Sequence, residues 1–301
     1  MHVIEFEHLT KDFGEVRAVD DLSFGIRVGT IVGFLGPNGS GKTTSLRALL
    51  GLVEPTSGTA HIDGRPYREL ADPLRRVGVM LEAAAHPARS ARNHLRVLAA
   101  EARVPVSRVD ELLELVELTQ AARRSVGGFS LGMRQRLGLA GALIGDPQIL
   151  VLDEPANGLD PEGIRWLRDF LRGLAAEGRT ILLSSHVLGE VAQTVDEAVV
   201  IARGRLVAHA PLAQLLASGN REPRVRVRVS DPAGLVFALA AIGVHADFGE
   251  ADELLVTGAS AEQVAETAFD RGIVVYALAA EAQTLEDVFF DLTTPSQEAI
   301  A

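Results

Sequence analysis

One segment constrains the fold of this chain more than any other feature: it reads Gly36-Pro37-Asn38-Gly39-Ser40-Gly41-Lys42-Thr43. It matches the pattern G-x-x-x-x-G-K-[ST] at every fixed position, and it lies between an apolar run, residues 30–35, and a helix-like segment that begins at Thr44. A strand, a glycine loop and a helix in this order form a phosphate-binding unit in which backbone N–H groups wrap the anion. The segment therefore predicts an α/β fold that binds a nucleoside triphosphate.

The side chains of the segment support the same interpretation. Lys42 is placed to reach the β- and γ-phosphates, and the hydroxyl of Thr43 is placed to ligate Mg²⁺. The helix that begins near Thr44 offers its positive N-terminal end to the same anion. The alternative is a tight turn that matches by chance, but Lys11 is the only other lysine of the chain, which makes a chance match rare.

The composition limits the class of protein. A chain of 301 residues allows one large domain, or a large and a small one. The absence of cysteine excludes disulfides and thiolate sites, and the net charge of −11 argues against general nucleic-acid binding. The sequence has no secretory signal pattern at its N-terminus and no apolar run of about 20 residues, so we expect no membrane span.

The first 210 residues have the pattern of an α/β protein with a mainly helical insertion. Apolar or alternating runs predict strands at residues 2–8, 22–28, 58–63, 77–81, 149–152 and 180–184. Helical periodicity extends over about 82–137 and again over 162–177, and we expect helices between and after the last two strands. We place the nucleotide-binding domain at residues 1–218, with a helical subdomain at about 82–140.

A second domain is expected at residues 222–301. After a helix-like link, residues 211–218, strands are predicted at 224–229, 244–248, 253–256 and 273–278. Helices are predicted to begin at Asp231-Pro232, at Ser260 with a capping box to Gln263, and at Thr284. The order β-α-β-β-α-β predicts a small α+β, ferredoxin-like unit.

Arginine alternates with valine in the first strand of this unit, at Arg224, Arg226 and Arg228. One interpretation is a face that binds an anion, a lipid or RNA. The favoured interpretation is a solvated strand face whose charges prevent pairing between sheet edges.

Two carboxylates follow the apolar strand at 149–152, where ligands of open α/β sheets bind. Asp153 is placed to hold Mg²⁺, which prefers hard oxygen ligands, and Glu154 is placed to orient or deprotonate the attacking water. An Asp-Glu pair alone is often only a helix start, but a phosphate loop upstream favours the functional interpretation.

Further motifs occur in the order typical of one family. They are Phe13 in Lys11-Asp12-Phe13-Gly14, the segment Phe129-Ser130-Leu131-Gly132-Met133-Arg134-Gln135-Arg136, the loop Asn157-Gly158-Leu159-Asp160, and His186 after a strand. With the phosphate loop and Asp153-Glu154, they make residues 2–210 resemble the nucleotide-binding subunit of ATP-binding cassette (ABC) transporters. The resemblance implies a P-loop NTPase core with antiparallel β and helical subdomains, and ATP with Mg²⁺ as ligands.

The resemblance also implies roles for these residues. Ser130 and Gly132 would contact the γ-phosphate of ATP held by a partner subunit, and Asp160 belongs to a loop that crosses the dimer interface. His186 would sense the γ-phosphate, and Phe13 would stack on adenine. Taken alone, His186 and Phe13 would more often be core residues, and Ser130 with Gly132 would be a helix cap.

One position departs from the family pattern. Glu82 follows the strand at 77–81, where the family usually has a glutamine near the metal and the membrane partner. A carboxylate at this position would ligate Mg²⁺ more strongly, or would repel the γ-phosphate and slow turnover.

The resemblance implies an ATPase subunit that forms a head-to-tail homodimer and powers a separate membrane permease at the cytoplasmic face of the membrane. The C-terminal domain resembles the appendage of exporters of drugs, antibiotics or lipids, and homodimer contact or regulation is our hypothesis for it. The alternatives are a soluble ABC ATPase that acts on ribosomes or DNA, and a regulatory protein that binds ATP without turnover. ABC ATPases that act on ribosomes resemble two cassettes in one chain, and those that act on DNA have a long coiled coil between the phosphate motifs; this sequence has neither feature. The presence of Glu154 and His186 disfavours a protein that binds ATP without turnover.

Overall fold

The computed structural model describes residues 2–81, 85–217, 223–249, 253–281 and 287. The predictions for Glu82 and for a helix that begins at Thr284 lie outside these residues. Among the described residues the chain divides into a large unit that ends at Gln214 and a small unit that begins at Leu215. Each unit is described by itself.

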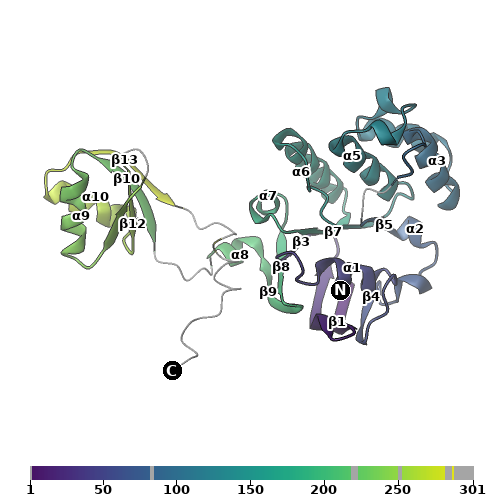
Figure 1. Cartoon of the computed structure of the whole chain (residues 1–301), viewed down its shortest axis with the longest axis horizontal. Helices are drawn as coiled ribbons and strands as arrows, with labels where there is room; N and C mark the ends of the chain where they lie inside the picture. Colours follow the sequence, from purple (N-terminus) through teal and green to yellow (C-terminus); the bar gives the residue numbers. More distant parts are fainter. Residues whose placement is uncertain (1, 82–84, 218–222, 250–252, 282–286, 288–301) are drawn as a thin grey trace. The chain divides into compact units, whose positions relative to one another are not determined.

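The large unit is built on a six-stranded sheet with the order β5-β6-β7-β3-β8-β9 (Figure 1). All neighbours pair in parallel except β9, which runs antiparallel to β8. The strands are β3 (Ile31–Leu35), β5 (Val77–Met80), β6 (Ile149–Leu152), β7 (Thr180–Ser185), β8 (Glu197–Ala202) and β9 (Arg205–Pro211). Every residue of β3, β6 and β7 is buried, as expected for central parallel strands that are covered on both faces.

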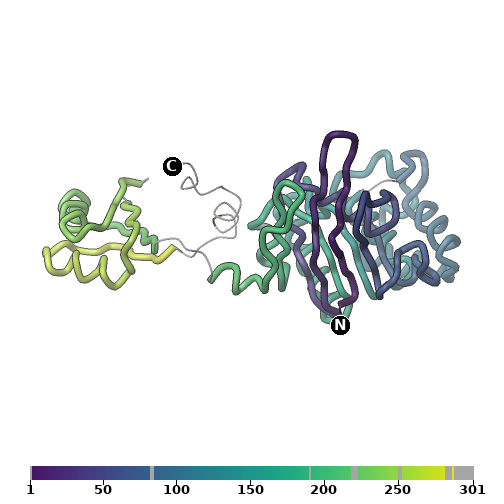
Figure 2. The backbone as a smooth tube through the Cα atoms, turned by 90° about the horizontal axis from the view of Figure 1, so that it is seen from below, coloured from purple at the N-terminus to yellow at the C-terminus, as the bar shows by residue number. Residues whose placement is uncertain are grey.

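A three-stranded antiparallel sheet with the order β2-β1-β4 completes the strands of this unit. Its members are β1 (His2–Phe13), β2 (Val16–Arg27) and β4 (Ser57–Ile62). Figure 2 shows β1 and β2 as one long purple hairpin. Phe24 joins the two sheets, because its ring lies 4.5 Å from that of Phe6 on β1 and 5.5 Å from that of Phe34 on β3.

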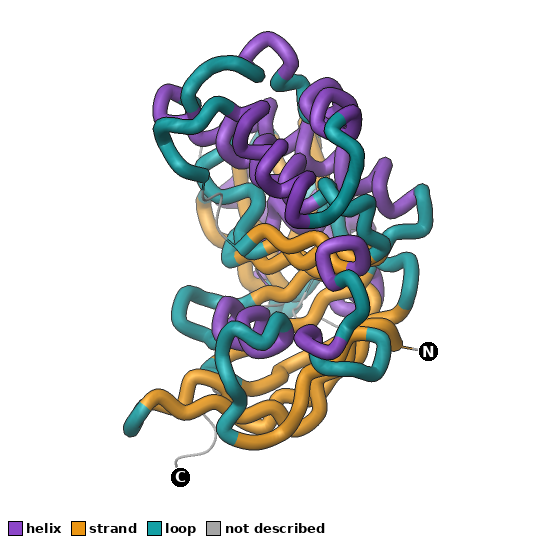
Figure 3. The backbone as a smooth tube through the Cα atoms, turned by 90° about the vertical axis from the view of Figure 1, so that its right-hand side faces the viewer, coloured by secondary structure: helices purple, strands orange, loops and turns teal. Residues whose placement is uncertain are grey.

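The helices of the large unit are α1 (Lys42–Leu49), α2 (Pro73–Arg76), α3 (Ala91–Glu101), α4 (Ser107–Leu115), α5 (Leu131–Ala142), α6 (Pro161–Ala176) and α7 (Leu188–Ala192). Three short 3₁₀ turns lie at Tyr67–Glu69, Thr119–Ala121 and Val126–Gly128. Helices α3, α4 and α5 pack on one another, and α5 also packs on β5. Figure 3 shows these helices gathered above the strands. The helical insertion is therefore a subdomain at the β5 end of the sheet.

The small unit contains a four-stranded antiparallel sheet with the order β11-β12-β10-β13. Helix α8 (Leu212–Ala217) spans the boundary, and the elements that follow it are β10 (Arg224–Val229), α9 (Pro232–Ala240), β11 (His245–Phe248), β12 (Glu253–Thr257), α10 (Ala261–Asp270) and β13 (Val275–Glu281). Apart from α8, which carries the chain across the division between the two units, this is the expected β-α-β-β-α-β order. The capping box of Ser260 and Gln263 and the helix start at Asp231 are confirmed as well.

Three predictions need correction. The strands at 2–8 and 22–28 are longer than expected, because register shifts let the β1–β2 pairing continue past Leu9 and back to Val16. Residues 197–211 form the hairpin β8–β9, where only helices were expected after β7. The arginine row on β10 is solvated as expected, since Arg226 and Arg228 are exposed, but it lies on a central strand between β12 and β13 and therefore does not protect a sheet edge.

Among the described residues, no helix combines the length and the apolar character that crossing a membrane requires.

Candidate functional site

A cleft of about 620 Å³ opens over the phosphate loop. Residues of the loop line one side, and residues after β6 and β7 line another, where the strands of the parallel sheet end. The lining residues are Phe13, Ala18, Asn38, Gly39, Ser40, Gly41, Lys42, Thr43, Thr44, Glu154, Asn157 and His186.

The backbone of the loop requires its glycines. Gly39 and Gly41 have φ angles of +80° and +104°, a region that side chains with a Cβ rarely adopt. At Gly36 a Cβ atom would lie 2.5 Å from the carbonyl oxygen of Ile201. The buried hydroxyl oxygen of Ser40 has no hydrogen-bond partner among the described residues, which fits a cradle built for an additional polar group.

Lys42 is buried inside this loop, with 5% of its side chain exposed. Its ammonium donates to the carbonyl oxygens of Gly36, at 2.7 Å, and Pro37, at 3.3 Å. The same Nζ lies 3.5 Å from Oε1 of Glu154, which places one positive charge between the loop and the carboxylate. The loop carbonyls and Glu154 stabilise a buried cation that would otherwise be costly.

Thr43 and Asp153 form the part of the site that fits a divalent metal. The hydroxyl of Thr43 donates to Oδ2 of Asp153 at 2.7 Å, and the hydroxyl of Ser184 donates to Oδ1. A backbone hydrogen bond from Asp153 to Met80 at 2.7 Å fixes the end of β6. Hydroxyl and carboxylate oxygens are hard donors of the kind that Mg²⁺ prefers, so these residues fit the ion.

Glu154 and His186 form the second pair. Nδ1 of His186 lies 2.8 Å from Oε2 of Glu154, and the backbone N–H of Glu154 donates to the hydroxyl of Ser184 at 2.9 Å. Glu154 has a φ angle of +50°, which is unusual for a residue with a side chain and is often found at functional sites. The carboxylate is therefore held toward the cleft by its backbone, by Ser184 and by His186.

Phe13 lies at the rim of the cleft with 51% of its surface exposed. It is the last residue of β1, and the ammonium of Lys11 lies 5.0 Å from its ring centre. An exposed aromatic beside a phosphate loop is available for stacking on a flat ligand, which a core phenylalanine is not.

The remaining predicted residues lie in a second cleft, of about 470 Å³, whose lining includes Ser130, Gly132 and Asp160. Ser130 caps α5 by accepting a hydrogen bond from the N–H of Met133, and Asp160 caps α6 by accepting one from Gly163. The sequence analysis allowed the cap at Ser130, whereas the cap at Asp160 was not predicted. The structure does not bring them to the phosphate loop of their own chain.

The structure thus brings together the phosphate loop, Asp153, Glu154, His186 and Phe13, and it keeps Ser130, Gly132 and Asp160 apart from them. The expected metal ligand Glu82 lies outside the described residues. The sequence reasoning missed Ser184, which contacts both carboxylate residues. The sequence feature that could have identified Ser184 is its position as a polar residue near the end of the apolar strand β7, which pairs with the strand that precedes Asp153 and Glu154.

The chain is similar to known proteins in sequence and in fold. Residues 19–157 match the family described as ABC transporter, and residues 223–286 match a domain of unknown function. The chain is 43% identical to the bacitracin transport ATP-binding protein BcrA of Bacillus licheniformis, over 71% of each chain. It is 38% identical to the Nod factor export ATP-binding protein I of Burkholderia orbicola, over 81% of this chain and 82% of that one.

A relative in Bacillus subtilis, the uncharacterized ABC transporter ATP-binding protein YdbJ, matches over nearly the full length, with 32% identity over 98% of this chain and 97% of its own. Among solved structures, an ATP-binding subunit of an ABC transporter has 26% identity and a TM-score of 0.65, over 71% of this chain and 92% of that one. A dimeric post-hydrolysis cassette bound to ADP and Pi, at 24% identity and a TM-score of 0.63 over 69% of this chain and 98% of that one, shares the fold.

Proposed function

We propose that this chain, which belongs to the ABC transporter family, is the ATP-hydrolysing subunit of an exporter of drugs, antibiotics or lipids. The single observation that carries the proposal is the cluster of Lys42, Glu154 and His186 at the phosphate loop. The relative named for Nod factor export supports the direction of transport, and the relative named for bacitracin transport supports an antibiotic as the transported compound. A separate permease supplies the path across the membrane, and the chain binds it as a peripheral subunit at the cytoplasmic face.

The residues of the cleft have distinct parts in hydrolysis. Lys42 and the loop N–H groups bind the phosphates, and Phe13 stacks on adenine. Glu154 accepts a proton from the attacking water, and His186 holds the carboxylate in place through its 2.8 Å contact. Thr43 and Asp153 would hold Mg²⁺, which would supply charge neutralisation at the phosphates when bound. Positioning and electrostatics of this kind account for most of the catalysis of phosphoryl transfer.

Two copies of the chain complete the site. Ser130 and Gly132 lie at the N-terminus of α5, where a hydroxyl and backbone N–H groups favour an anion, yet they line a different cleft from Lys42. A head-to-tail homodimer would place this cleft of one copy over the phosphate loop of the other. Two ATP molecules would then be enclosed, and hydrolysis would reopen the dimer.

The test is Glu154→Gln, which keeps the shape of the side chain and removes the proton acceptor. We expect ATP binding to persist, phosphate release to fall by at least about a hundredfold, and an ATP-bound dimer to accumulate in size-exclusion chromatography. Glu114→Gln, at an exposed position of α4, is the matched control and should hydrolyse ATP as the wild type does. Phosphate release at the wild-type rate by Glu154→Gln would refute the assignment of the base.

A further inference from the structure

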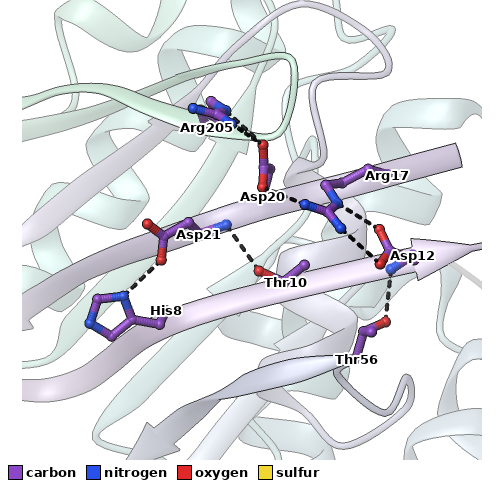
Figure 4. Close-up of polar contacts among 8 residues, drawn as sticks. All are labelled: His8, Thr10, Asp12, Arg17, Asp20, Asp21, Thr56 and Arg205. Atoms are coloured by element: carbon purple, nitrogen blue, oxygen red, sulfur yellow. Dashed lines mark hydrogen bonds and ion pairs between the residues drawn. The ribbon is translucent and has the colours of Figure 1, made fainter.

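Four charged side chains form a row that alternates in sign, in the order Asp12, Arg17, Asp20 and Arg205 (Figure 4). Nε and Nη2 of Arg17 donate to the two carboxylate oxygens of Asp12 at 2.8 and 3.3 Å, and Nη1 donates to Oδ1 of Asp20 at 3.2 Å. From the other side, Nε of Arg205 donates to Oδ2 of Asp20 at 2.6 Å. The row therefore joins the tips of two hairpins, β1–β2 and β8–β9.

One end of the row is tied to the phosphate loop by backbone hydrogen bonds. The N–H of Gly204, beside Arg205, donates to the carbonyl oxygen of Ser40 at 3.0 Å. The N–H of Asp20 donates to the carbonyl oxygen of Gly204 at 2.9 Å. Gly204 has a φ angle of +81°, and a Cβ there would lie 3.1 Å from the carbonyl oxygen of Ala18. The turn of β8–β9 is thus inserted between β2 and the loop, where a Cβ would be crowded by backbone atoms and strained by the positive φ angle.

The other end of the row reaches the aromatic residue of the cleft. Asp12 directly precedes Phe13 and pairs with Arg17 across the β1–β2 ladder. Its backbone N–H donates to the hydroxyl of Thr56 at 2.9 Å, which fixes the strand from its second side. The position of Phe13 along β1 is therefore connected, through Arg17 and Asp20, to the turn that supports Ser40.

We propose that this row sets the position of Phe13 relative to the phosphate loop, and that Arg17 is a positioning residue for adenine nucleotides. The inference rests on the proposed function, because it assumes that Phe13 stacks on adenine. A nucleotide held at its base and at its phosphates binds tightly only when the two subsites are kept at the right separation. Arg17 contributes by connecting Asp12 to Asp20, and it does not itself line the cleft.

The charges of the row support this role. The hydrogen bond from Arg205, followed by the one from Arg17, holds the pKa of Asp20 below its ordinary value, because both guanidinium groups stabilise the ionised carboxylate. The side chain of Arg17 is 55% exposed, and ion pairs at such positions contribute little to the free energy of unfolding. Removing Arg17 therefore affects nucleotide binding more than folding.

The experiment compares ADP with pyrophosphate, since neither is hydrolysed and only ADP carries the base. Calorimetric titrations of the full chain measure both dissociation constants for the wild type, Arg17→Gln, Arg17→Lys and Arg226→Gln. Arg226 is the matched control, because its side chain is 57% exposed and pairs with two carboxylates, those of Glu253 and Glu281, in the small unit. Thermal unfolding of each variant is recorded in parallel.

We expect Arg17→Gln to weaken ADP binding about fivefold, with pyrophosphate binding and the unfolding temperature unchanged. Arg17→Lys should recover part of the loss, and Arg226→Gln should bind both ligands as the wild type does. Wild-type binding of both ligands by Arg17→Gln would overturn the inference, as would an equal weakening of both ligands. If the wild type itself binds ADP no better than pyrophosphate, the proposed role of Phe13 fails, and the inference fails with it.

Discussion

At the scale of single residues, Ser184 explains how two carboxylates with different roles are held side by side. It is fully buried, it donates to Asp153, and it accepts from the backbone of Glu154. One hydroxyl thus orients the residue that fits the metal and fixes the backbone of the residue that we propose as the base. Loss of this hydroxyl would leave a buried N–H and a carboxylate oxygen without that partner.

We therefore expect Ser184→Ala to lower the free energy of unfolding by about 1–3 kcal/mol and the rate of ATP hydrolysis by about tenfold or more. Denaturant unfolding and phosphate release measure the two effects. Ser185→Ala is the control, because within the described part of the chain the hydroxyl of Ser185 bonds only with the backbone of Val187. Wild-type turnover in Ser184→Ala would show that Ser184 does not organise the site.

His94, on α3, gives the large unit a dependence on pH. Burial, and to a smaller extent the charge of Arg89, lowers its pKa below the ordinary value of about 6.5. The unfolded chain therefore takes up a proton at this residue before the folded chain does. As the pH falls through about 6.5, stability is lost, because the unfolded state then binds more protons.

The prediction is that the free energy of unfolding falls less between pH 7.5 and pH 5.5 in His94→Gln than in the wild type. Urea unfolding at several pH values measures the slope, and His245→Gln, at an exposed histidine of the small unit, is the control. Equal slopes in His94→Gln and the wild type would contradict the assignment.

At the scale of elements, the sequence predicted those parts whose pattern is local. The phosphate loop between β3 and α1, the buried strand β6 and the capping box of α10 each depend on a few neighbouring residues, and each is confirmed. The hairpin β8–β9 was missed because its charged turn at Arg203 and Gly204 was not recognised as a hairpin signal. The central position of β10 depends on pairing with residues about 30 and 50 positions away, which no local pattern contains.

The candidate site shows the same difference between residues that a local pattern predicts and residues that only distant contacts bring together. Residues within one motif, such as Lys42 and Thr43, were found from spacing alone, and Asp153 and Glu154 followed from the strand before them. Ser184 was missed because its importance arises only where β6 and β7 pair in parallel and bring position 184 beside Asp153. Contacts between segments far apart in the sequence therefore account for most of what sequence reasoning left out.

The capping box allows a test at this scale. Ser260 accepts a hydrogen bond from the N–H of Gln263, and the side chain of Gln263 accepts one from the N–H of Ser260. Ser260→Ala should lower the stability of the small unit by about 1 kcal/mol, while Ser260→Thr should retain most of it. Denaturant unfolding followed by circular dichroism measures the loss, and equal stability of Ser260→Ala and the wild type would contradict it.

At the scale of the whole molecule, we propose that two copies of the chain together build each nucleotide site. The phosphate loop and Glu154 line one cleft, and Ser130 with Gly132 lines another. A head-to-tail dimer would place the phosphate-loop cleft of each copy against the Ser130 cleft of its partner. The dimer, with the ATP that it encloses, would then be the functional unit that acts on the permease.

Because the chain contains no cysteine, a disulfide crosslink between two introduced cysteines tests this claim most directly. One copy carries Asn38→Cys in the phosphate loop, and the other carries Leu131→Cys beside Ser130; both positions are exposed, and both copies carry Glu154→Gln. We expect the mixture to form a covalent dimer when ATP is added, and neither variant to do so alone. Crosslinking of either variant with itself, or crosslinking of the mixture that does not depend on ATP, would contradict the head-to-tail site.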